Sequence, residues 1–287
     1  MNAKPDAPLP GDRAASPPPA GPPPAGPLPA SPGARLATGL ARIPGALWPV
    51  LSLAGFLVLW ALVAAALASP VLPGPVAVAE AGYRATGDGY FGHLGATLLR
   101  VLAAFALAMS IGSAIGYALG SSAAADRAFS GWLTLFLNLP ALVTIILCYM
   151  WFGLTEVAAI TAVAVNKIPN VAATLREGAR ALSRDLDEMA GLYGLSRAAR
   201  LRHVALPQLA PFFAAAARNG LALVWKIVLV VELLGRSNGV GYALHLHFQL
   251  FDVATILAYA FGFILVVQAI EMLLLEPWER RANRWRR

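Results

Sequence analysis

The chain has 287 residues, of which 58% are hydrophobic and only 13% are charged, and its mean hydropathy is +0.65. A soluble domain carries about a quarter charged residues, so this composition excludes an ordinary soluble protein and indicates an integral membrane protein. The formal net charge of +7 would by itself also suit a nucleic-acid-binding protein. The single cysteine, Cys148, lies within an apolar run, so there is no disulfide framework and we expect a small buried side chain there.

The first part of the sequence, residues 1–33, is rich in proline, with Ala, Gly and Ser between the prolines. Such a segment cannot bury enough apolar surface to offset the entropy of ordering it. We therefore expect residues 1–40 to be a disordered cytoplasmic tail, with a ligand for a proline-binding domain as the alternative. The transmembrane domain is expected over residues 45–276, and a basic cytoplasmic tail over residues 277–287.

Two apolar stretches follow the tail. Residues 47–67 are long enough to cross a bilayer, and they are too long and too far along the chain for a cleaved signal peptide. Residues 69–96 are rich in turn residues and predict an external loop. The second span, 97–119, contains Arg100 near its outer end, where we expect the side chain to snorkel to the interface. Small residues at four-residue spacing predict a close helix-packing seam on this span: Ala104, Ala108, Gly112, Gly116 and Gly120.

The next apolar sequence, residues 131–169, is too long for one helix. Pro140 and a later Phe-Gly-Leu break predict two spans in a hairpin, over 133–152 and 155–169. Lys167 would then mark the cytoplasmic end of the second of these spans.

The distribution of Lys and Arg predicts the orientation. Two further spans, over 208–234 and 253–275, bring the number to six. With a cytoplasmic N-terminus, the outer loops carry Arg84 and Arg236, whereas the inner segments carry a much larger set: Lys4, Arg13, Arg35, Arg42, Arg127, Arg176, Arg180, Arg184, Arg197, Arg200, Arg202, Arg280, Arg281, Arg284, Arg286 and Arg287. Both termini are therefore expected in the cytoplasm, and the positive charge is explained by topology without nucleic-acid binding.

The fifth span contains three charged residues, Arg218, Lys226 and Glu232. A charge at the bilayer centre costs a few kcal/mol and is by default a functional hypothesis. Lys226 and Glu232 differ by about 120° around a helix and about 9 Å along it, so they do not form a same-face pair. Each either finds a partner on another helix, with Glu271 and Glu156 as candidates, or lines a water-filled path. A path lined by Lys226 would favour an anionic solute.

The sequence contains no evident catalytic or metal-binding constellation. His245 and His247 are two residues apart, so they would not face each other on a helix, and no further ligand lies nearby at zinc spacing. No GxxxxGK[ST] phosphate loop is present, so we do not expect this chain to hold ATP in that way. The spans also lack a nucleophile–base pair. We expect no enzyme activity, cofactor or metal.

A polar, arginine-bearing stretch over residues 185–211 interrupts the apolar runs on the cytoplasmic side. It predicts two short helices broken at Gly191 and Gly194. Ser183 and Ser196 are the expected N-caps, and two aspartates follow Ser183, where they would complement the positive end of the helix dipole.

The spacing within this stretch resembles the EAA loop of ABC importer permeases. The loop has the pattern Glu-Ala-Ala, three residues, Gly, nine residues, Ile-any-Leu-Pro. This chain has Glu188-Met189-Ala190, Gly194 and Val204-Ala205-Leu206-Pro207 at the same spacing, with departures at Met189 and Val204. Further segments within roughly residues 45–287 look like the nitrate/sulfonate/taurine branch: Leu72-Pro73-Gly74-Pro75, Thr97-Leu98-Leu99-Arg100, Leu139-Pro140-Ala141, Trp151-Phe152-Gly153-Leu154 and Val231-Glu232-Leu233-Leu234.

The resemblance implies an all-α, type I ABC importer permease in the inner membrane. It implies separate cytoplasmic ATPase subunits, a periplasmic solute-binding protein and a second permease copy. Segment 183–207 would couple to the ATPase through Glu188, Ala190, Gly191, Gly194, Leu206 and Pro207. The implied substrate is a small anion such as nitrate, taurine or an alkanesulfonate. A membrane-embedded enzyme, or a channel without an ATPase partner, is the alternative.

Overall fold

A computed structural model describes residues 47–275 and 277 of the chain. Within these residues the secondary structure is helical and contains no strand, which confirms the all-α class. The expected proline-rich tail, and all but the first residue of the expected basic tail, lie outside the described residues. The chain divides into two units, residues 1–56 and 57–287, and their boundary falls within the first long helix. The packing described below is that of the second unit.

Several helices are long and apolar enough to cross a membrane. Among the described residues there are five, and a sixth if a bent pair of helices counts as one span. The five are α2 (Trp48–Leu67), α4 (Tyr90–Ser121), α7 (Glu156–Arg180), the continuous segment Arg197–Gly235 that contains α10 (Leu206–Gly235), and Val253–Leu273, which contains α12 (Val253–Ile270). The bent pair is α5 (Ala123–Leu137) and α6 (Ala141–Phe152). Six crossings are consistent with the prediction.

The third crossing differs from the single helix predicted over 133–152. The expected polar link before it is already helical, because the Ser122 side chain accepts a hydrogen bond from the Ala125 amide and caps α5. The chain then bends by 94° between α5 and α6. Pro140 lies at this bend, and proline both lacks an amide hydrogen and disfavours the helical conformation in the residue before it. The predicted span contained Pro140 but did not include a sharp bend between two helices at this position.

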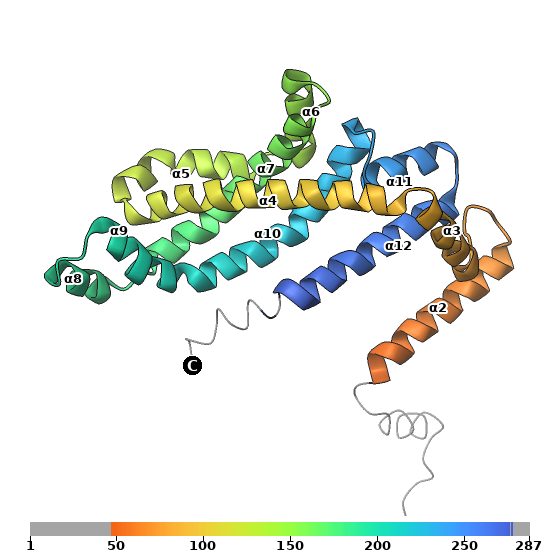
Figure 1. Cartoon of the computed structure of the whole chain (residues 1–287), viewed down its shortest axis with the longest axis horizontal. Coiled ribbons are helices and arrows are strands. Elements are labelled where there is room, and N and C mark those ends of the chain that lie inside the picture. Colours follow the sequence, from red (N-terminus) through yellow and green to blue (C-terminus); the bar gives the residue numbers. More distant parts are fainter. Residues whose placement is uncertain (1–46, 276, 278–287) are drawn as a thin grey trace, which may run out of the picture. The chain divides into compact units, whose positions relative to one another are not determined.

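The fourth crossing, α7, extends to Arg180 and does not end at residue 169 as predicted. Thr155 caps it by accepting from the Ala158 amide, and Pro169 lies within it. The prediction that Lys167 marks the inner end is therefore wrong, since the lysine is in the middle of the helix. Proline is tolerated inside membrane helices when neighbouring helices stabilise the segment, and α7 packs against α4, α6 and α10 (Figure 1).

The predicted seam of small residues on α4 is confirmed, and its partner is α7. Ala104 and Ala108 are fully buried. A Cβ atom placed on Gly112 would lie 2.7 Å from the Val171 Cβ, and one placed on Gly116 would lie 2.8 Å from the Leu175 Cβ. The two backbones therefore approach more closely than any larger residue would allow, as small residues permit in membrane helix pairs.

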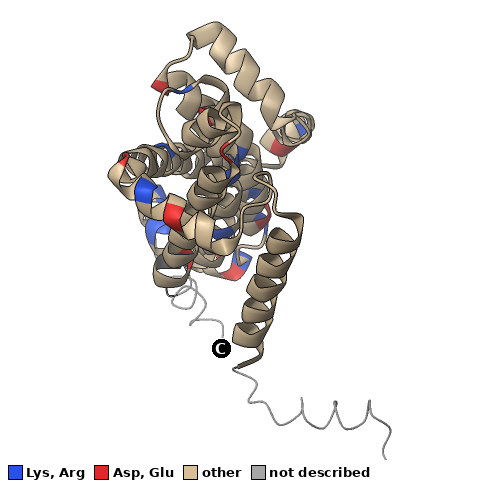
Figure 2. Cartoon of the chain, turned by 90° about the vertical axis from the view of Figure 1, so that its right-hand side faces the viewer, with Lys and Arg blue, Asp and Glu red and all other residues tan. Residues whose placement is uncertain are grey.

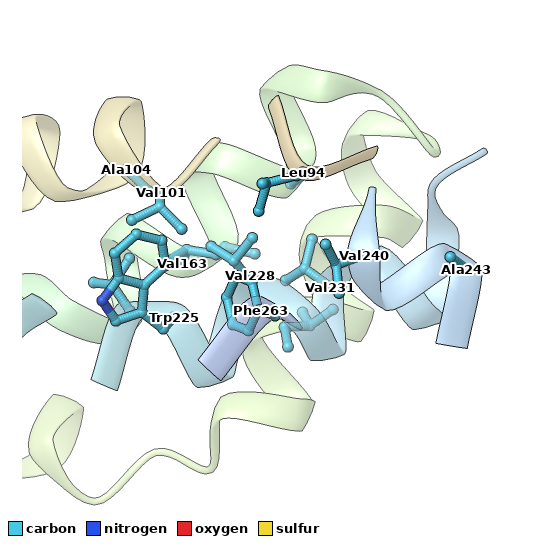
Figure 3. Packing of buried hydrophobic residues seen from close by; sticks show 14 of the residues in the cluster. Leu94, Val101, Ala104, Val163, Trp225, Val228, Val231, Val240, Ala243 and Phe263 are labelled. Atoms are coloured by element: carbon cyan, nitrogen blue, oxygen red, sulfur yellow. The ribbon is translucent and has the colours of Figure 1, made fainter. Parts of the chain in front are cut away.

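The main apolar core lies between α4, α7, α10 and α12 (Figure 3). Val101 and Val228 are almost completely buried in it, and the rings of Trp225 and Phe263 meet edge to face with centroids 5.7 Å apart. The outer surfaces of the helices also carry many exposed apolar side chains, and charged residues interrupt them in few places (Figure 2). Such an exposed apolar surface suits contact with lipid or with other subunits.

Two segments expected as irregular external loops contain helices. The turn-rich residues after α2 form α3 (Pro75–Gly87), which begins with proline at its first position, where a missing amide hydrogen costs nothing. The link after α10 contains α11 (Val240–Gln249). Both helices pack against α12. Glycine in both segments, and proline in the first, indicated turns, but this composition did not predict the helices between the turns.

Candidate functional site

The polar stretch on the predicted cytoplasmic side contains two short helices, as expected. α8 (Arg184–Leu192) is capped by Ser183, whose side chain accepts from the Leu186 amide at 3.4 Å. α9 (Arg197–Arg200) is capped by Ser196, which accepts from the Ala199 amide at 3.3 Å. Each hydroxyl satisfies a backbone donor that the first turn of a helix leaves free. Both predicted caps are confirmed.

The break between the two helices is at Gly194 and not at Gly191, which lies inside α8. The Gly194 amide donates to the Gly191 carbonyl, and the Leu195 amide donates to the Ala190 carbonyl, both at 3.0 Å. These are the two hydrogen bonds of a Schellman helix end, which requires a left-handed residue. Gly194 has φ +66, and a Cβ placed on it would have no neighbour within 4 Å. Backbone conformation, rather than packing space, therefore favours glycine here.

The second short helix does not end before the fifth span. It continues through a π-helical turn, η2 (Leu201–Ala205), directly into α10. Pro207 lies at the start of α10, and the wider π turn accommodates its missing amide hydrogen. Leu206 and Pro207 therefore lie within one continuous helical segment, so a movement of α9 would act on the span without an intervening flexible loop.

The end of α8 exposes several apolar side chains. Leu192 is 88% exposed and Tyr193 79%, and Leu186 and Met189 on the preceding turns are also exposed. In contrast, Ala190 is buried against the rest of the chain. An apolar surface at the end of an otherwise charged segment is characteristic of a protein-binding site. Glu188, a further residue predicted to couple, is also exposed.

Arginine side chains hold this segment together. Arg200 donates from Nη2 to the Asp187 carbonyl at 3.0 Å and lies 3.6 Å from an oxygen of the Asp187 carboxylate, so it joins α9 to α8. At the inner end of α7, Arg176 and Arg180 both contact the Asp126 carboxylate on α5. Ion pairs thus join α8 to α9, and α7 to α5, in the region from which α8 projects.

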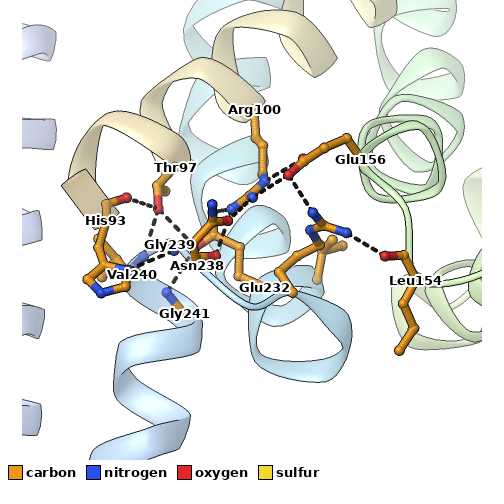
Figure 4. A network of polar contacts seen from close by, with 12 residues as sticks. His93, Thr97, Arg100, Leu154, Glu156, Glu232, Asn238, Gly239, Val240 and Gly241 are labelled. Carbon is orange, nitrogen blue, oxygen red and sulfur yellow. Dashed lines mark hydrogen bonds and ion pairs between the residues drawn. The ribbon is translucent and has the colours of Figure 1, made fainter.

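A second cluster of polar side chains lies at the opposite ends of α4, α7 and α10 (Figure 4). Arg100 is its centre and is only 5% exposed. Its guanidinium binds both carboxylate oxygens of Glu156, at 2.8 and 2.6 Å, and donates to Glu232 at 2.7 Å. The expectation that Arg100 snorkels to the interface is therefore wrong. Two carboxylates and the Asn238 carbonyl satisfy the guanidinium inside the protein, so the side chain has no need to reach water.

Glu232 is completely buried in this cluster. Besides Arg100, its carboxylate accepts from the Thr97 hydroxyl and from the Gly241 amide, each at 2.9 Å. Gly239 has φ +111, and a Cβ there would overlap with the Glu232 carboxylate. Arg236 also reaches Glu156, at 2.5 Å. The cluster contains two arginines and two glutamates, so its charges balance and it ties three spans to the loop after α10.

The other two charged residues of the fifth span lie together elsewhere. Arg218 and Lys226 line a groove of about 340 Å³ between α10 and α12, with Gln268 and Glu271 on the opposite wall. Arg218 Nε lies 4.0 Å from a Glu271 carboxylate oxygen. The structure thus places Arg218 and Lys226 in one groove and Glu232 in the outer cluster. Two glutamates were candidate partners for the charges of the fifth span. Glu271 lies opposite Arg218, and Glu156 binds the same arginine, Arg100, as Glu232 does.

Sequence reasoning missed Thr97, Arg100 and Asn238 as members of the outer cluster. One signal was present, since Thr97 and Arg100 are three residues apart and share a helix face near the same end of the membrane as Glu232. The partner on the loop could not be recognised, because Asn238 contributes through the fold of residues 236–239. Lys167 was also missed, because the span that contains it was predicted too short.

A family model for the binding-protein-dependent transport system inner membrane component matches residues 108–275, which is more than half of the chain. The chain belongs to this family. The match includes segment 183–207, the fifth span and the sixth span. Together with the apolar helices, it makes the protein a multi-pass inner-membrane component of a binding-protein-dependent ABC importer.

Relatives with more specific names agree with the expected branch. A protein of Escherichia coli (strain K12), named as an aliphatic sulfonates transport permease protein, SsuC, is 29% identical over 66% of this chain and 73% of its own length. The taurine transport system permease protein TauC of the same strain is 27% identical over 67% of this chain and 70% of its own length. The chain therefore lies in the nitrate/sulfonate/taurine branch of ABC permeases.

A solved structure supports the fold. The crystal structure of an amino acid ABC transporter with histidines aligns with 69% of this chain and 96% of that chain, with a TM-score of 0.57 and 21% sequence identity. The similarity confirms an ABC permease fold.

Proposed function

We propose that this chain forms the solute pathway of an ATP-driven importer and couples to a separate cytoplasmic ATPase through segment 183–207. In this proposal the transmembrane domain covers residues 45–276, and a second copy of the chain completes the pathway. The solute is delivered by a periplasmic binding protein and is a small anion such as nitrate, taurine or an alkanesulfonate. The observation that carries the proposal is the exposed apolar end of α8 within a segment at EAA-loop spacing.

The coupling role is supported by the way the segment is built. Leu192 and Tyr193 are presented to solvent, and Gly194 sets the angle at which α9 leaves. α9 is continuous with α10. A partner that binds α8 and α9 and then moves would therefore move the fifth span with them as a near-rigid body. A channel that opens without an ATPase would have no use for an exposed apolar end on this side.

The preference for an anion is supported by the groove between α10 and α12. Arg218 and Lys226 line it, and both side chains are exposed in the isolated chain. Arg218 is paired with Glu271. Lys226 lies on an exposed face of a spanning helix, where a cation requires water, a solute or another subunit beside it, since lipid would not stabilise it. The names of the sulfonate and taurine relatives favour the same class of solute.

The coupling proposal is tested by replacing Leu192 with aspartate and measuring co-purification of the ATPase. Leu192 is 88% exposed, so Leu192→Asp should leave folding and membrane insertion intact. Placing a charge in an apolar contact should reduce recovery of the ATPase at least about tenfold. Tyr83→Asp is the matched control, because Tyr83 is 82% exposed but lies on α3, at the other side of the predicted membrane. Full recovery of the ATPase with Leu192→Asp would contradict the proposal.

A further inference from the structure

Lys167 lies near the middle of a membrane-spanning helix. Helix α7 has 25 residues, and at a rise of 1.5 Å per residue Lys167 is about 16 Å from Glu156 and about 20 Å from Arg180. A bilayer core is about 30 Å thick, so the lysine is close to its centre. The residue is only 2% exposed in the isolated chain.

Lys167 lacks the counter-charge that the other buried cation has. Arg100 contacts two glutamates, whereas Lys167 forms no ion pair or hydrogen bond with any residue in the part of the chain that the structure describes. An isolated cation in the bilayer centre is costly, and such residues face a partner charge or a water-filled cavity in membrane proteins. The positive charge therefore requires water, or an anion from outside the described residues, next to it.

The surroundings of Lys167 on α7 are polar as well. Asn166, Lys167, Asn170 and Thr174 share one side of the helix at three- and four-residue spacing, and we call them the α7 polar stripe. Asn170 and Thr174 are half-buried and donate to backbone carbonyls one turn earlier, which leaves the amide oxygen of Asn170 available. Pro169 lies in the same turns and has no amide hydrogen, so the Val165 carbonyl loses its usual helical donor. A spanning helix that only packed against its neighbours would not need this polarity.

The wall opposite the lysine is small and apolar. A Cβ placed on Gly220 of α10 would lie 3.5 Å from Lys167 Cε and 3.4 Å from the Phe105 ring of α4. Both distances are ordinary van der Waals contacts, so Gly220 and Phe105 form an apolar wall beside the end of the lysine side chain. No carboxylate of α4 or α10 contacts Lys167 within the described residues, so neither neighbouring helix supplies a permanent counter-ion.

We propose that Lys167 is the charged contact for an oxyanion, such as a sulfonate or nitrate group, halfway along the pathway, and that the α7 polar stripe lines the pathway there. The inference rests on the proposed function, and it adds a site on α7 to the α10 groove that contains Arg218 and Lys226. The ammonium attracts the anion, and the amide and hydroxyl groups of the stripe supply hydrogen bonds that replace part of the lost hydration. A single cation with weak polar neighbours holds an anion loosely enough for it to leave, as transport requires.

The first test measures access and charge without any transported solute. In the assembled transporter with Cys148→Ala, Asn170→Cys is exposed to an anionic sulfonatoethyl methanethiosulfonate and to a cationic trimethylammonioethyl methanethiosulfonate. The anionic reagent should react faster, and Lys167→Met should lower the anionic-to-cationic rate ratio at least about tenfold, as expected for removing one unit charge within about 10 Å. Lys167→Arg should retain the ratio. Leu102→Cys, on an exposed apolar face of α4, is the control and should react slowly with both reagents.

Two results would overturn the inference. The first is an Asn170→Cys thiol that neither reagent reaches. The second is a rate ratio that Lys167→Met leaves unchanged, which would mean that a carboxylate of the second copy already neutralises the lysine. In that second case Lys167→Met should instead reduce recovery of the dimer.

Transport by the same variants separates this inference from the proposed function. With taurine and nitrate as probes, Lys167→Met should reduce ATP-dependent uptake at least about tenfold and Lys167→Arg should restore most of it. If the unmodified transporter moves neither probe, the proposed solute class fails, while the labelling ratio still decides the role of Lys167. If the unmodified transporter moves a probe and Lys167→Met moves it equally well, the inference is wrong and the proposed function stands.

Discussion

At the scale of single residues, the clearest feature is the balanced cluster around Arg100 and Glu232. Arg100 is 5% exposed and Glu232 is fully buried, and the two form an ion pair. Arg100 also binds Glu156, and Glu232 also accepts a hydrogen bond from Thr97. Buried ion pairs add little net stability compared with apolar packing, but removing one partner leaves an uncompensated charge. The cluster is therefore a place where single and double substitutions should behave very differently.

Arg100→Met should destabilise the protein by about 3–5 kcal/mol, because it leaves the Glu232 carboxylate buried without a cation. The double variant Arg100→Met/Glu232→Leu removes both charges and should recover a large part of that loss. Thermal unfolding of the detergent-solubilised protein measures the difference, with Arg84→Met on α3 as a control. Equal destabilisation by the single and double variants would show that the loss does not come from leaving Glu232 buried without its cation.

Lys226 has a different environment, since it lines the open groove beside α12. If the groove is part of the pathway, Lys226→Ala should reduce anion uptake several-fold and leave assembly with the ATPase intact, because no buried pair is broken. Uptake in proteoliposomes and co-purification measure the two effects separately. Unchanged uptake would remove Lys226 from the pathway.

At the scale of elements, local signals predicted structure well where the cause was local. The Ser183 and Ser196 caps, the small-residue seam on α4 and the helix break at Gly194 all follow from short-range geometry. The errors came from segments whose stability depends on neighbours. Helix α7 continues past Pro169 because α4 and α10 enclose it, and its polar residues made it look like the end of a span.

The same limit explains the candidate site. The two short helices of segment 183–207 could be predicted because their caps and the glycine between them are local, sequential signals. The outer cluster could not be predicted in full, because it joins Arg100, Glu156 and Glu232 from three helices. Charges within spans could be located from the sequence, but which of them meet depends on helix packing that hydropathy does not encode.

The proposed coupling segment, 183–207, offers a test of backbone conformation at this scale. Gly194 adopts φ +66 with open space around it, so Gly194→Val should be disfavoured by backbone strain and not by a clash. Asparagine tolerates the left-handed region much better than a β-branched residue. We expect Gly194→Val to lose most ATPase association at normal membrane levels, and Gly194→Asn to keep most of it. Co-purification measures both, and equal loss in the two variants would argue against a conformational role.

At the scale of the whole molecule, the two ends of the proposed pathway are built differently. Residues of the outer cluster tie α4, α7 and α10 together through charge pairs, whereas the inner end projects the apolar tip of α8. A partner that moves α8 and α9 would therefore act on helices that are joined at their far ends. Family membership makes the chain a component of an ABC importer, and the proposed division of roles assigns energy input to the inner end and solute contact to the spans.

The most direct test of this central claim is solute uptake by the reconstituted complex of permease, ATPase and binding protein in proteoliposomes. Taurine and nitrate are the probes. ATP is supplied on the side of the membrane where the ATPase lies, and a complex with a hydrolysis-deficient ATPase is the control. We predict uptake that requires ATP hydrolysis and that Leu192→Asp abolishes while Tyr83→Asp does not. Uptake that continues without hydrolysis, or that Leu192→Asp leaves unchanged, would contradict it.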